Sequence, residues 1–199
     1  TGASTINIFA SSDTTNLTNL SSGATIGLSK TGSADQVMGA VDVKLADATG
    51  SSDVINFGVN EVTSATLTGT AIETANFILS TTDTDIAEAT LTISALNATS
   101  ITVTGANGDT GHTLGLGTLD TDTTSVDASG YRGILTAQGS TSATTFTLRG
   151  GVAHDVTGGT GNDTMTISSG AATYNVDGGA GTDSLTMTIS GAVAANSIA

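Results

Sequence analysis

Short apolar segments recur along most of this chain at intervals of about ten residues, and this rhythm limits the fold more than any other feature. From residue 61 onward the segments are centred on Leu67, Phe77, Leu91, Ile101, Leu114, Val126, Leu135, Phe146, Val156, Met165, Tyr174 and Leu185. The interval is too short for a strand, a helix and a second strand. It is typical of half-coils in a solenoid, in which a full coil takes about twenty residues. The rhythm predicts an all-β chain folded as a parallel β-solenoid.

The residues around these centres favour short strands that end in tight turns. Glycine follows many of them, as in LTG at 67–69 and LRG at 148–150, and glycine allows the positive φ that a sharp corner requires. The chain has no proline to interrupt a strand. A β-sandwich also has short strands, but aromatic residues are only 3% of this chain, so the rings of a thick core are nearly absent. We therefore favour a solenoid with a thin aliphatic core.

The rhythm divides the chain into four segments. Residues 1–60 are interpreted as irregular N-terminal coils with longer loops, and residues 61–149 as the Thr-rich part of the solenoid. Residues 150–191 are coils with a distinct turn motif, and residues 192–199 are expected to be a frayed tail. Within the first segment, candidate strands lie at 5–9, 24–28, 41–45 and 54–57.

The charge of the chain restricts its partners. Eighteen acidic residues face four basic ones, which gives a formal net charge of −14. Such a surface repels phosphate backbones and anionic lipids, so we expect no nucleic-acid partner, and the lack of a long apolar run predicts no membrane insertion. Without cysteine there is no disulfide and no thiolate ligand. Cations are the natural partners.

Two copies of one motif lie near the C-terminus. Residues 158–166 read GGTGNDTMT and residues 178–186 read GGAGTDSLT, and both match the nonapeptide G-G-x-G-x-D-x-U-x at every fixed position. The copies are one expected coil apart, so their turns should stack. Stacked turns offer the carboxylate and carbonyl oxygens that Ca²⁺ prefers. We expect one Ca²⁺ between them, held by Asp163 and Asp183 and by carbonyls around Gly159, Gly161, Gly179 and Gly181. The alternative is a pair of ordinary Gly-Asp turns without an ion.

Other acidic turns give weaker signals. A degenerate copy of the motif, GGVAHD at 150–155, could place Asp155 in a second metal site on the opposite edge or simply at the end of a turn. The turns around Asn107 and Asp109, and around Asp120 and Asp122, are equally well explained as solvated loops.

The chain carries no recognised catalytic motif. It lacks a G-x-S-x-G, an H-E-x-x-H and a phosphate-binding Walker loop. Its two histidines, His112 and His154, lack the paired spacing of zinc ligands and are expected to be loop residues. A carboxylate pair of the kind that cleaves glycosides remains an alternative, but the basic and aromatic residues that bind sugars are scarce. We therefore expect a protein that is not an enzyme.

The chain resembles a family of bacterial surface proteins. The two nonapeptides are similar to RTX repeats, and the preceding residues resemble the C-terminal region of Caulobacter-type surface-layer proteins. The phrases that carry this resemblance lie at 45–57 (LADATGSSDVINF), 70–85 (TAIETANFILSTTDTD), 89–105 (ATLTISALNATSITVTG), 124–130 (TSVDASG) and 147–151 (TLRGG). The resemblance implies a right-handed solenoid (β-helix or β-roll) that is exported by a type I secretion system and binds Ca²⁺. One departure is that residues 167–177 are longer than a nonapeptide and lack its Gly-Gly start.

These observations lead to one expected function and two alternatives. The resemblance implies a structural component of an extracellular surface layer (S-layer) on a Gram-negative cell, which folds on binding Ca²⁺ and self-associates into a lattice. The alternatives are an RTX adhesin or matrix filament that contacts cells, surfaces or a cell-surface glycan, and a solenoid enzyme that degrades polysaccharides.

Overall fold

All the regular structure described in the chain is β-strand. The computed structural model describes residues 5–9, 11–29, 36–47, 49–60, 62–79, 88–105, 112–168, 170–188 and 197–198. The odd-numbered strands are β1 (Thr5–Phe9), β3 (Ala24–Ser29), β5 (Val54–Asn60), β7 (Thr74–Leu79), β9 (Ser100–Gly105), β11 (Ser125–Tyr131), β13 (Thr145–Leu148), β15 (Thr164–Ile167) and β17 (Ser184–Met187). The even-numbered strands are β2 (Thr15–Leu20), β4 (Gln36–Leu45), β6 (Val62–Thr70), β8 (Glu88–Ala95), β10 (Thr113–Thr118), β12 (Ile134–Gln138), β14 (Asp155–Thr157), β16 (Asn175–Asp177) and β18 (Ser197–Ile198).

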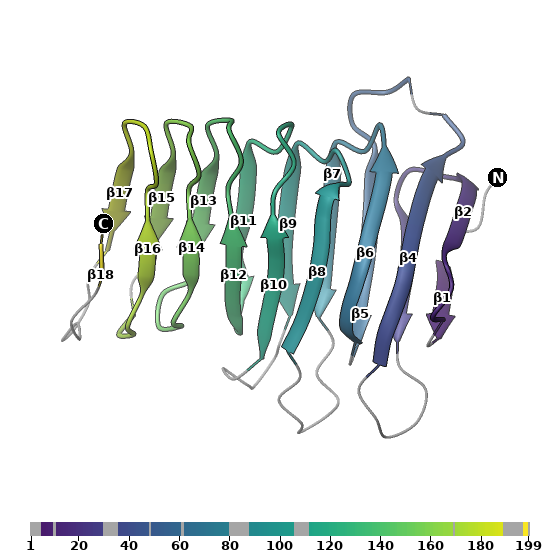
Figure 1. Cartoon of the computed structure of the whole chain (residues 1–199), viewed down its shortest axis with the longest axis horizontal. Coiled ribbons are helices and arrows are strands. Elements are labelled where there is room, and N and C mark those ends of the chain that lie inside the picture. The colour runs from purple at the N-terminus through teal and green to yellow at the C-terminus, as the bar shows by residue number, and fades with distance from the viewer. Residues whose placement is uncertain are drawn as a thin grey trace.

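The strands form two nine-stranded parallel sheets, one of odd-numbered strands and one of even-numbered strands, each in chain order. The chain therefore crosses to the other sheet after every strand and lays each coil beside the previous one. In Figure 1 the even-numbered strands run upward in front, the odd-numbered strands run downward behind, and the chain advances from right to left. This winding is right-handed, as is usual for parallel strands joined by crossovers. The predicted parallel β-solenoid is confirmed.

The length of one coil changes along the chain. Near the C-terminus, Ser125 pairs with Thr145, 20 residues later, and Thr164 pairs with Ser184, again 20 residues later. Some earlier coils are longer, since Ala24 pairs with Ile55, 31 residues later. The expected coil of about twenty residues is therefore correct from β11 onward, and for some earlier coils such as the step from β5 to β7, whereas other early coils carry extra residues in their connections.

The core is a thin row of side chains between the two sheets. Strands alternate between buried and outward positions, as in β5, where Ile55, Phe57 and Val59 are buried. Most buried side chains are aliphatic, as the composition indicates. The rings of Phe57 and Phe77 stack with their centroids 5.2 Å apart. Because these two residues are directly paired between β5 and β7, the stack follows the solenoid axis.

The predicted strands agree closely with the observed ones. Eleven of the twelve predicted centres from Leu67 onward lie inside strands, and Tyr174 immediately precedes β16. The four predicted strands of the first sixty residues are also present, but β2 was missed, because its sequence TNLTNL has few apolar residues. In the expected tail, Ser197 and Ile198 pair with β16, and the rest of 192–199 lies outside the described residues.

We predict that truncating a stacked ring will test this core. The substitution Phe77→Ala should lower the free energy of unfolding by about 3–5 kcal/mol, because it opens a cavity in a row of side chains that cannot collapse easily. The matched control is Phe9→Ala, since Phe9 is 57% exposed and should contribute little. Urea unfolding followed by circular dichroism measures both. Equal losses for the two variants would contradict a packed inter-sheet core.

Candidate calcium site

The two motif turns stack on one edge of the solenoid. Residues 158–163 connect β14 to β15, residues 178–183 connect β16 to β17, and both turns lie on the upper edge in Figure 1. Gly159, Gly179 and Gly181 have positive φ angles of 105°, 84° and 141°. A Cβ on any of them would also collide with the backbone of the preceding turn. The motif glycines are therefore required by both backbone conformation and close stacking.

Asp163 lies at the centre of this arrangement with its carboxylate turned inward. The residue is only 1% exposed. Its Oδ1 accepts a hydrogen bond of 2.7 Å from the backbone N–H of Thr144 on the preceding coil. Its Oδ2 is buried and has no hydrogen-bond partner, and it lies against Gly158, where a Cβ would come within 2.5 Å of it. An ionised oxygen without a partner in such a place is costly unless a cation neutralises it.

The electrostatics of Asp163 follow from this position. Burial is the main cause that raises the pKa of its carboxyl group above the ordinary value, and the negative charge of Asp183 raises it further. The hydrogen bond from Thr144 acts in the opposite direction but does not reverse the shift. Without a cation, the ionised form of Asp163 is therefore disfavoured in the folded chain.

Asp183 repeats the arrangement one coil later. Its Oδ1 accepts a hydrogen bond of 2.8 Å from the backbone N–H of Asp163, and its Oδ2 lies against Gly178, where a Cβ would come within 2.6 Å. Asp183 is exposed, because it belongs to the last coil of the described odd-numbered sheet. The two carboxylates thus occupy equivalent positions in successive turns, as the sequence predicts.

The oxygen atoms around the pair suit a hard cation. The carbonyl oxygen of Gly178 and the Oδ2 of Asp163 both lie beside Gly158, and the carbonyl oxygen of Gly161 lies close to Gly181. Among the described residues, no group of three or more His, Cys, Asp and Glu side chains is placed to hold a metal. An ion here would need carbonyl oxygens besides two carboxylates, which is how Ca²⁺ is often bound. The turns fit Ca²⁺ and offer no nitrogen or sulfur ligand for zinc.

Asp155 does not join this pair. It is the first residue of β14, next to the opposite edge of the solenoid, and its side chain is exposed. Its Oδ1 accepts a hydrogen bond of 2.7 Å from Asn175 Nδ2 on the neighbouring strand. A metal role for Asp155 stays a prediction without support from the geometry. The predicted turn at Asn107 and Asp109 lies outside the described residues.

His154 is part of the packed interior and is more than a loop residue. It is 1% exposed, its Nδ1 accepts a hydrogen bond from the N–H of Leu135, and its Nε2 donates to the carbonyl of Arg149. Burial lowers the pKa of His154 to about 4, although the Arg149 carbonyl opposes the shift. Both ring nitrogens are occupied by backbone groups, so the histidine is a structural bridge between coils. This role of His154 could not be predicted from the sequence, because no spacing of residues indicates a histidine that bridges two coils.

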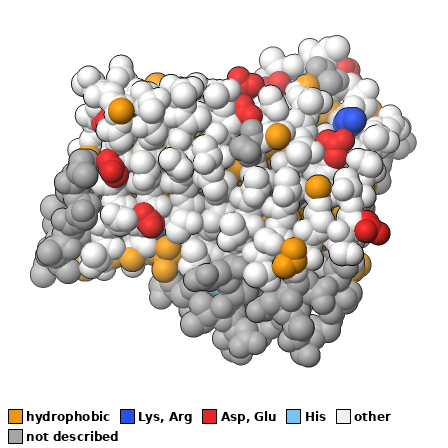
Figure 2. All heavy atoms as spheres, in the orientation of Figure 1, with side chains coloured by type: hydrophobic (Ala, Val, Ile, Leu, Met, Phe, Trp, Pro, Cys, Tyr) orange, Lys and Arg blue, Asp and Glu red, His pale blue; other side chains and the backbone are white. Residues whose placement is uncertain are grey.

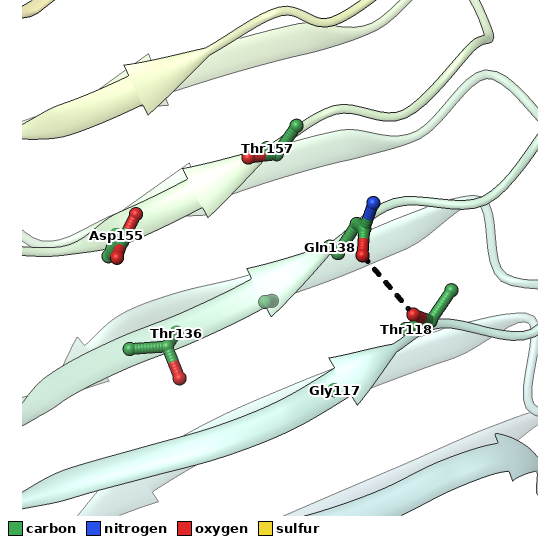
Figure 3. A pocket seen from close by; sticks show the side chains of 7 residues that line it. Gly117, Thr118, Thr136, Gln138, Asp155 and Thr157 are labelled. Atoms are coloured by element: carbon green, nitrogen blue, oxygen red, sulfur yellow. Dashed lines mark hydrogen bonds between the residues drawn. The ribbon is translucent and has the colours of Figure 1, made fainter.

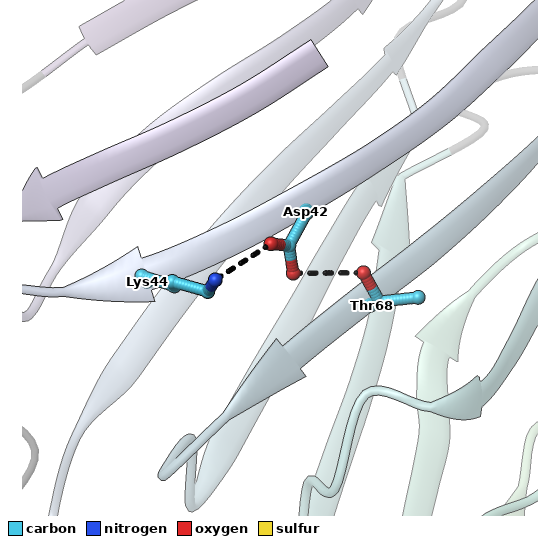
Figure 4. A network of polar contacts seen from close by, with 3 residues as sticks. All are labelled: Asp42, Lys44 and Thr68. Carbon is cyan, nitrogen blue, oxygen red and sulfur yellow. Dashed lines mark hydrogen bonds and ion pairs between the residues drawn. The ribbon is translucent and has the colours of Figure 1, made fainter. Parts of the chain in front are cut away.

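Two other polar regions lie away from the motif turns. An open groove of about 400 Å³ lies over the even-numbered sheet and is lined by Gly117, Thr118, Thr136, Ala137, Gln138, Asp155 and Thr157 (Figure 3). Further toward the N-terminus, Asp42 accepts a hydrogen bond from Thr68 and pairs with Lys44 at 3.3 Å (Figure 4). The Thr68 hydrogen bond, with Lys44, keeps the pKa of Asp42 below its ordinary value despite partial desolvation. Asp42 is thus satisfied within the protein.

Comparison of the chain with protein-family models, with curated proteins and with solved structures found no match. No helix among the described residues is long and apolar enough to cross a membrane. The candidate site therefore rests on its own geometry.

We predict that His154 makes the fold sensitive to acid. A histidine whose pKa is lowered on folding stabilises the protein fully above its unfolded pKa, near 6.5, and this stability is lost as the pH falls toward about 4. The shift corresponds to about 3 kcal/mol. Urea unfolding of wild type and His154→Gln at pH 7.5, 6 and 4.5 should show the difference between the two shrinking with acid. If the difference between the two proteins stays constant over these pH values, the prediction is wrong, because the pKa of His154 would then be the same in the folded and unfolded chains.

For Asp163 we predict that the ionised side chain destabilises the folded chain when a chelator is present. Its raised pKa means that the ionised carboxylate weakens the folded state above that pKa, and that this penalty disappears as the pH falls through it. Asp163→Asn should therefore be more stable than wild type at pH 7.5 in EDTA, with the advantage vanishing toward pH 4. Asp127→Asn removes the same charge from an exposed position and serves as the control. An unchanged or lowered stability of Asp163→Asn at pH 7.5 would contradict the unbalanced buried charge.

Proposed function

We propose that this chain is a structural solenoid module of a secreted bacterial surface layer, and that its C-terminal turns bind Ca²⁺. The observation that carries the proposal is the buried Oδ2 of Asp163, which lacks a hydrogen-bond partner beside the equivalent carboxylate of Asp183. A bound Ca²⁺ would supply the positive charge that these oxygens lack. The resemblance to RTX repeats and Caulobacter-type surface-layer proteins is the second support, and it alone suggests the lattice and export from a Gram-negative cell.

The residues of the motif turns explain how folding would depend on the ion. Without Ca²⁺, the turns bring Asp163 and Asp183 together in a chain whose formal net charge is already −14. On the face seen in Figure 2, acidic side chains lie at several places, some of them close together near the upper edge, and like charges of this kind repel one another. The turns do not exist in the unfolded chain, so the free energy of metal binding becomes free energy of folding. Scarce Ca²⁺ inside the cell would keep the last coils loose until export.

The ends of the solenoid offer a route to self-association. Among the described strands, β1, β2, β17 and β18 each have a hydrogen-bonded neighbour on one side only. A strand edge of this kind pairs readily with another strand, which can come from a further coil or from another copy of the protein. Repeated contacts of the second kind would build an extended assembly.

The groove over the even-numbered sheet favours a second candidate, a binding module of the adhesin type. Its hydroxyl, amide and carboxylate groups, including Thr136, Gln138 and Asp155, could form hydrogen bonds to the hydroxyls of a glycan. The groove is open and has no aromatic platform, so binding through it would be weak. We keep the surface layer as the leading function.

We predict that Ca²⁺ controls the folding of the purified chain. Far-ultraviolet circular dichroism should show β-structure increasing as Ca²⁺ is added after EDTA. In Asp163→Asn/Asp183→Asn, the Ca²⁺ concentration at half-transition should rise at least about tenfold, since even an outer-sphere partner of a metal typically contributes 10–100-fold. Negative-stain microscopy at the end points should show two-dimensional arrays only with Ca²⁺.

The control variant is Asp120→Asn/Asp122→Asn, which removes the same charge from another turn of the same edge. It should titrate like wild type. If wild type is equally folded in EDTA and in Ca²⁺, the motif turns are ordinary turns and the calcium proposal is wrong. Isolated fibres, or binding to a glycan array without sheets, would favour the adhesin or filament.

A further inference from the structure

A second pair of acidic side chains occupies the same corner of the solenoid as Asp163 and Asp183, several coils away. Asp53 directly precedes β5, and Glu73 directly precedes β7. Asp163 and Asp183 directly precede β15 and β17 in the same way. The two pairs therefore lie in one column along the upper edge in Figure 1, each pair spanning two successive turns. No repeat motif marks Asp53 and Glu73 in the sequence.

The hydrogen bonds of the two pairs have the same pattern. The backbone N–H of Asp53 donates to Oε2 of Glu73 at 2.7 Å, just as the N–H of Asp163 donates to Asp183. The carbonyl of Asp53 accepts from the N–H of Thr74, as the carbonyl of Asp163 accepts from Ser184. In each pair the later acid thus binds the backbone of the earlier one, and a ladder bond closes the turn.

Asp53 also has the unpartnered oxygen that distinguishes Asp163. The residue is 9% exposed, and its Oδ2 is buried without a hydrogen-bond partner. This oxygen lies against Gly50, where a Cβ would come within 2.8 Å of it, as Asp163 Oδ2 lies against Gly158. In both pairs the unpartnered oxygen thus lies beside a glycine of its own turn.

The corner residues between the two pairs are threonines, and they need no cation. Thr99 Oγ1 donates to the carbonyl of Glu73 at 2.8 Å, and Thr124 Oγ1 donates to the carbonyl of Thr99 at 3.3 Å. Thr144 Oγ1 donates to the carbonyl of Thr123 at 3.2 Å. A hydroxyl can donate where an ionised carboxylate cannot, so at these corners an uncharged side chain adds a hydrogen bond to the backbone ladder. Within the described part of this column, carboxylates stand in place of hydroxyls at the two pairs.

We infer that Asp53 and Glu73 form a second divalent-cation site, selective for Ca²⁺, between the turn residues 49–53 and the turn that ends at Glu73. The two side chains offer carboxylate oxygens, and a site shared between two turns suits the flexible, high coordination of Ca²⁺ better than the strict octahedron of Mg²⁺. The ion would neutralise Asp53 Oδ2 and fasten two successive N-terminal coils. The inference stands on the Asp53 geometry and is independent of the lattice and of the motif site.

The test counts the calcium ions bound by the full chain. Equilibrium dialysis against Ca²⁺ is carried out on wild type, on Asp53→Asn/Glu73→Gln, and on Asp163→Asn/Asp183→Asn. We expect each double variant to bind one ion fewer than wild type and the combined variant to bind two fewer. The control, Asp120→Asn/Asp122→Asn, matches the change in charge and should bind as many ions as wild type.

The outcomes separate the two sites. If Asp53→Asn/Glu73→Gln binds as many ions as wild type while the Asp163 variant loses one, the second site is wrong and the motif site stands. If only the Asp53 variant loses an ion, the second site is supported and the motif site is wrong. Crystals of wild type soaked in Tb³⁺ give a measurement that does not depend on the folding of any variant. An anomalous peak beside Asp53 Oδ2 supports the site, and a peak beside Asp163 alone overturns it.

Discussion

The whole structure depends on one constraint, which is that every coil must satisfy the backbone groups of the coil before it. Parallel strands do this along the sheets, where Thr145, Thr164 and Ser184 follow one another in register. The corners are more demanding, because stacked turns bring backbones into close contact. At Gly159 and Gly179 a side chain would meet the backbone of the preceding turn, so only glycine allows the coils to stack there. Chain composition follows from this requirement: glycine at corners, threonine on the sheets and no proline.

The upper corner shows how side chains complete this ladder in two chemical ways. In the middle coils, threonine hydroxyls donate to carbonyls of the preceding coil, as Thr99 does to Glu73. At Asp163 and Asp53, carboxylates take the same position, and each leaves one buried oxygen without a donor. A neutral ladder is complete by itself, whereas a charged one needs a cation to balance it. The proposed calcium dependence would therefore belong to particular corners and not to the solenoid as a whole.

The fold was largely predictable because its signal is local and repeated. The ten-residue rhythm located nearly every strand from Leu67 onward, and the exception among the early strands, β2, has too few apolar residues to stand out. Coil length was predicted less well. A longer connection leaves the strands unchanged, so the rhythm of apolar residues does not report how many residues lie between them. The length of the coil from Ala24 to Ile55 was therefore not predicted by the rhythm, although the same rhythm describes the C-terminal coils accurately.

The class of fold and the position of the motif turns can be predicted from the amino-acid sequence, because alternation, glycine placement and the nonapeptides are properties of neighbouring residues. Which side chains from different coils meet depends on the three-dimensional structure. It paired Asp163 with the N–H of Thr144, removed His154 from solvent, and placed Asp155 on a sheet face away from the motif pair. It also brought Asp53 to Glu73 at a corner without any motif. The physical reason is that such contacts depend on register between coils, which is set by the lengths of all the intervening connections.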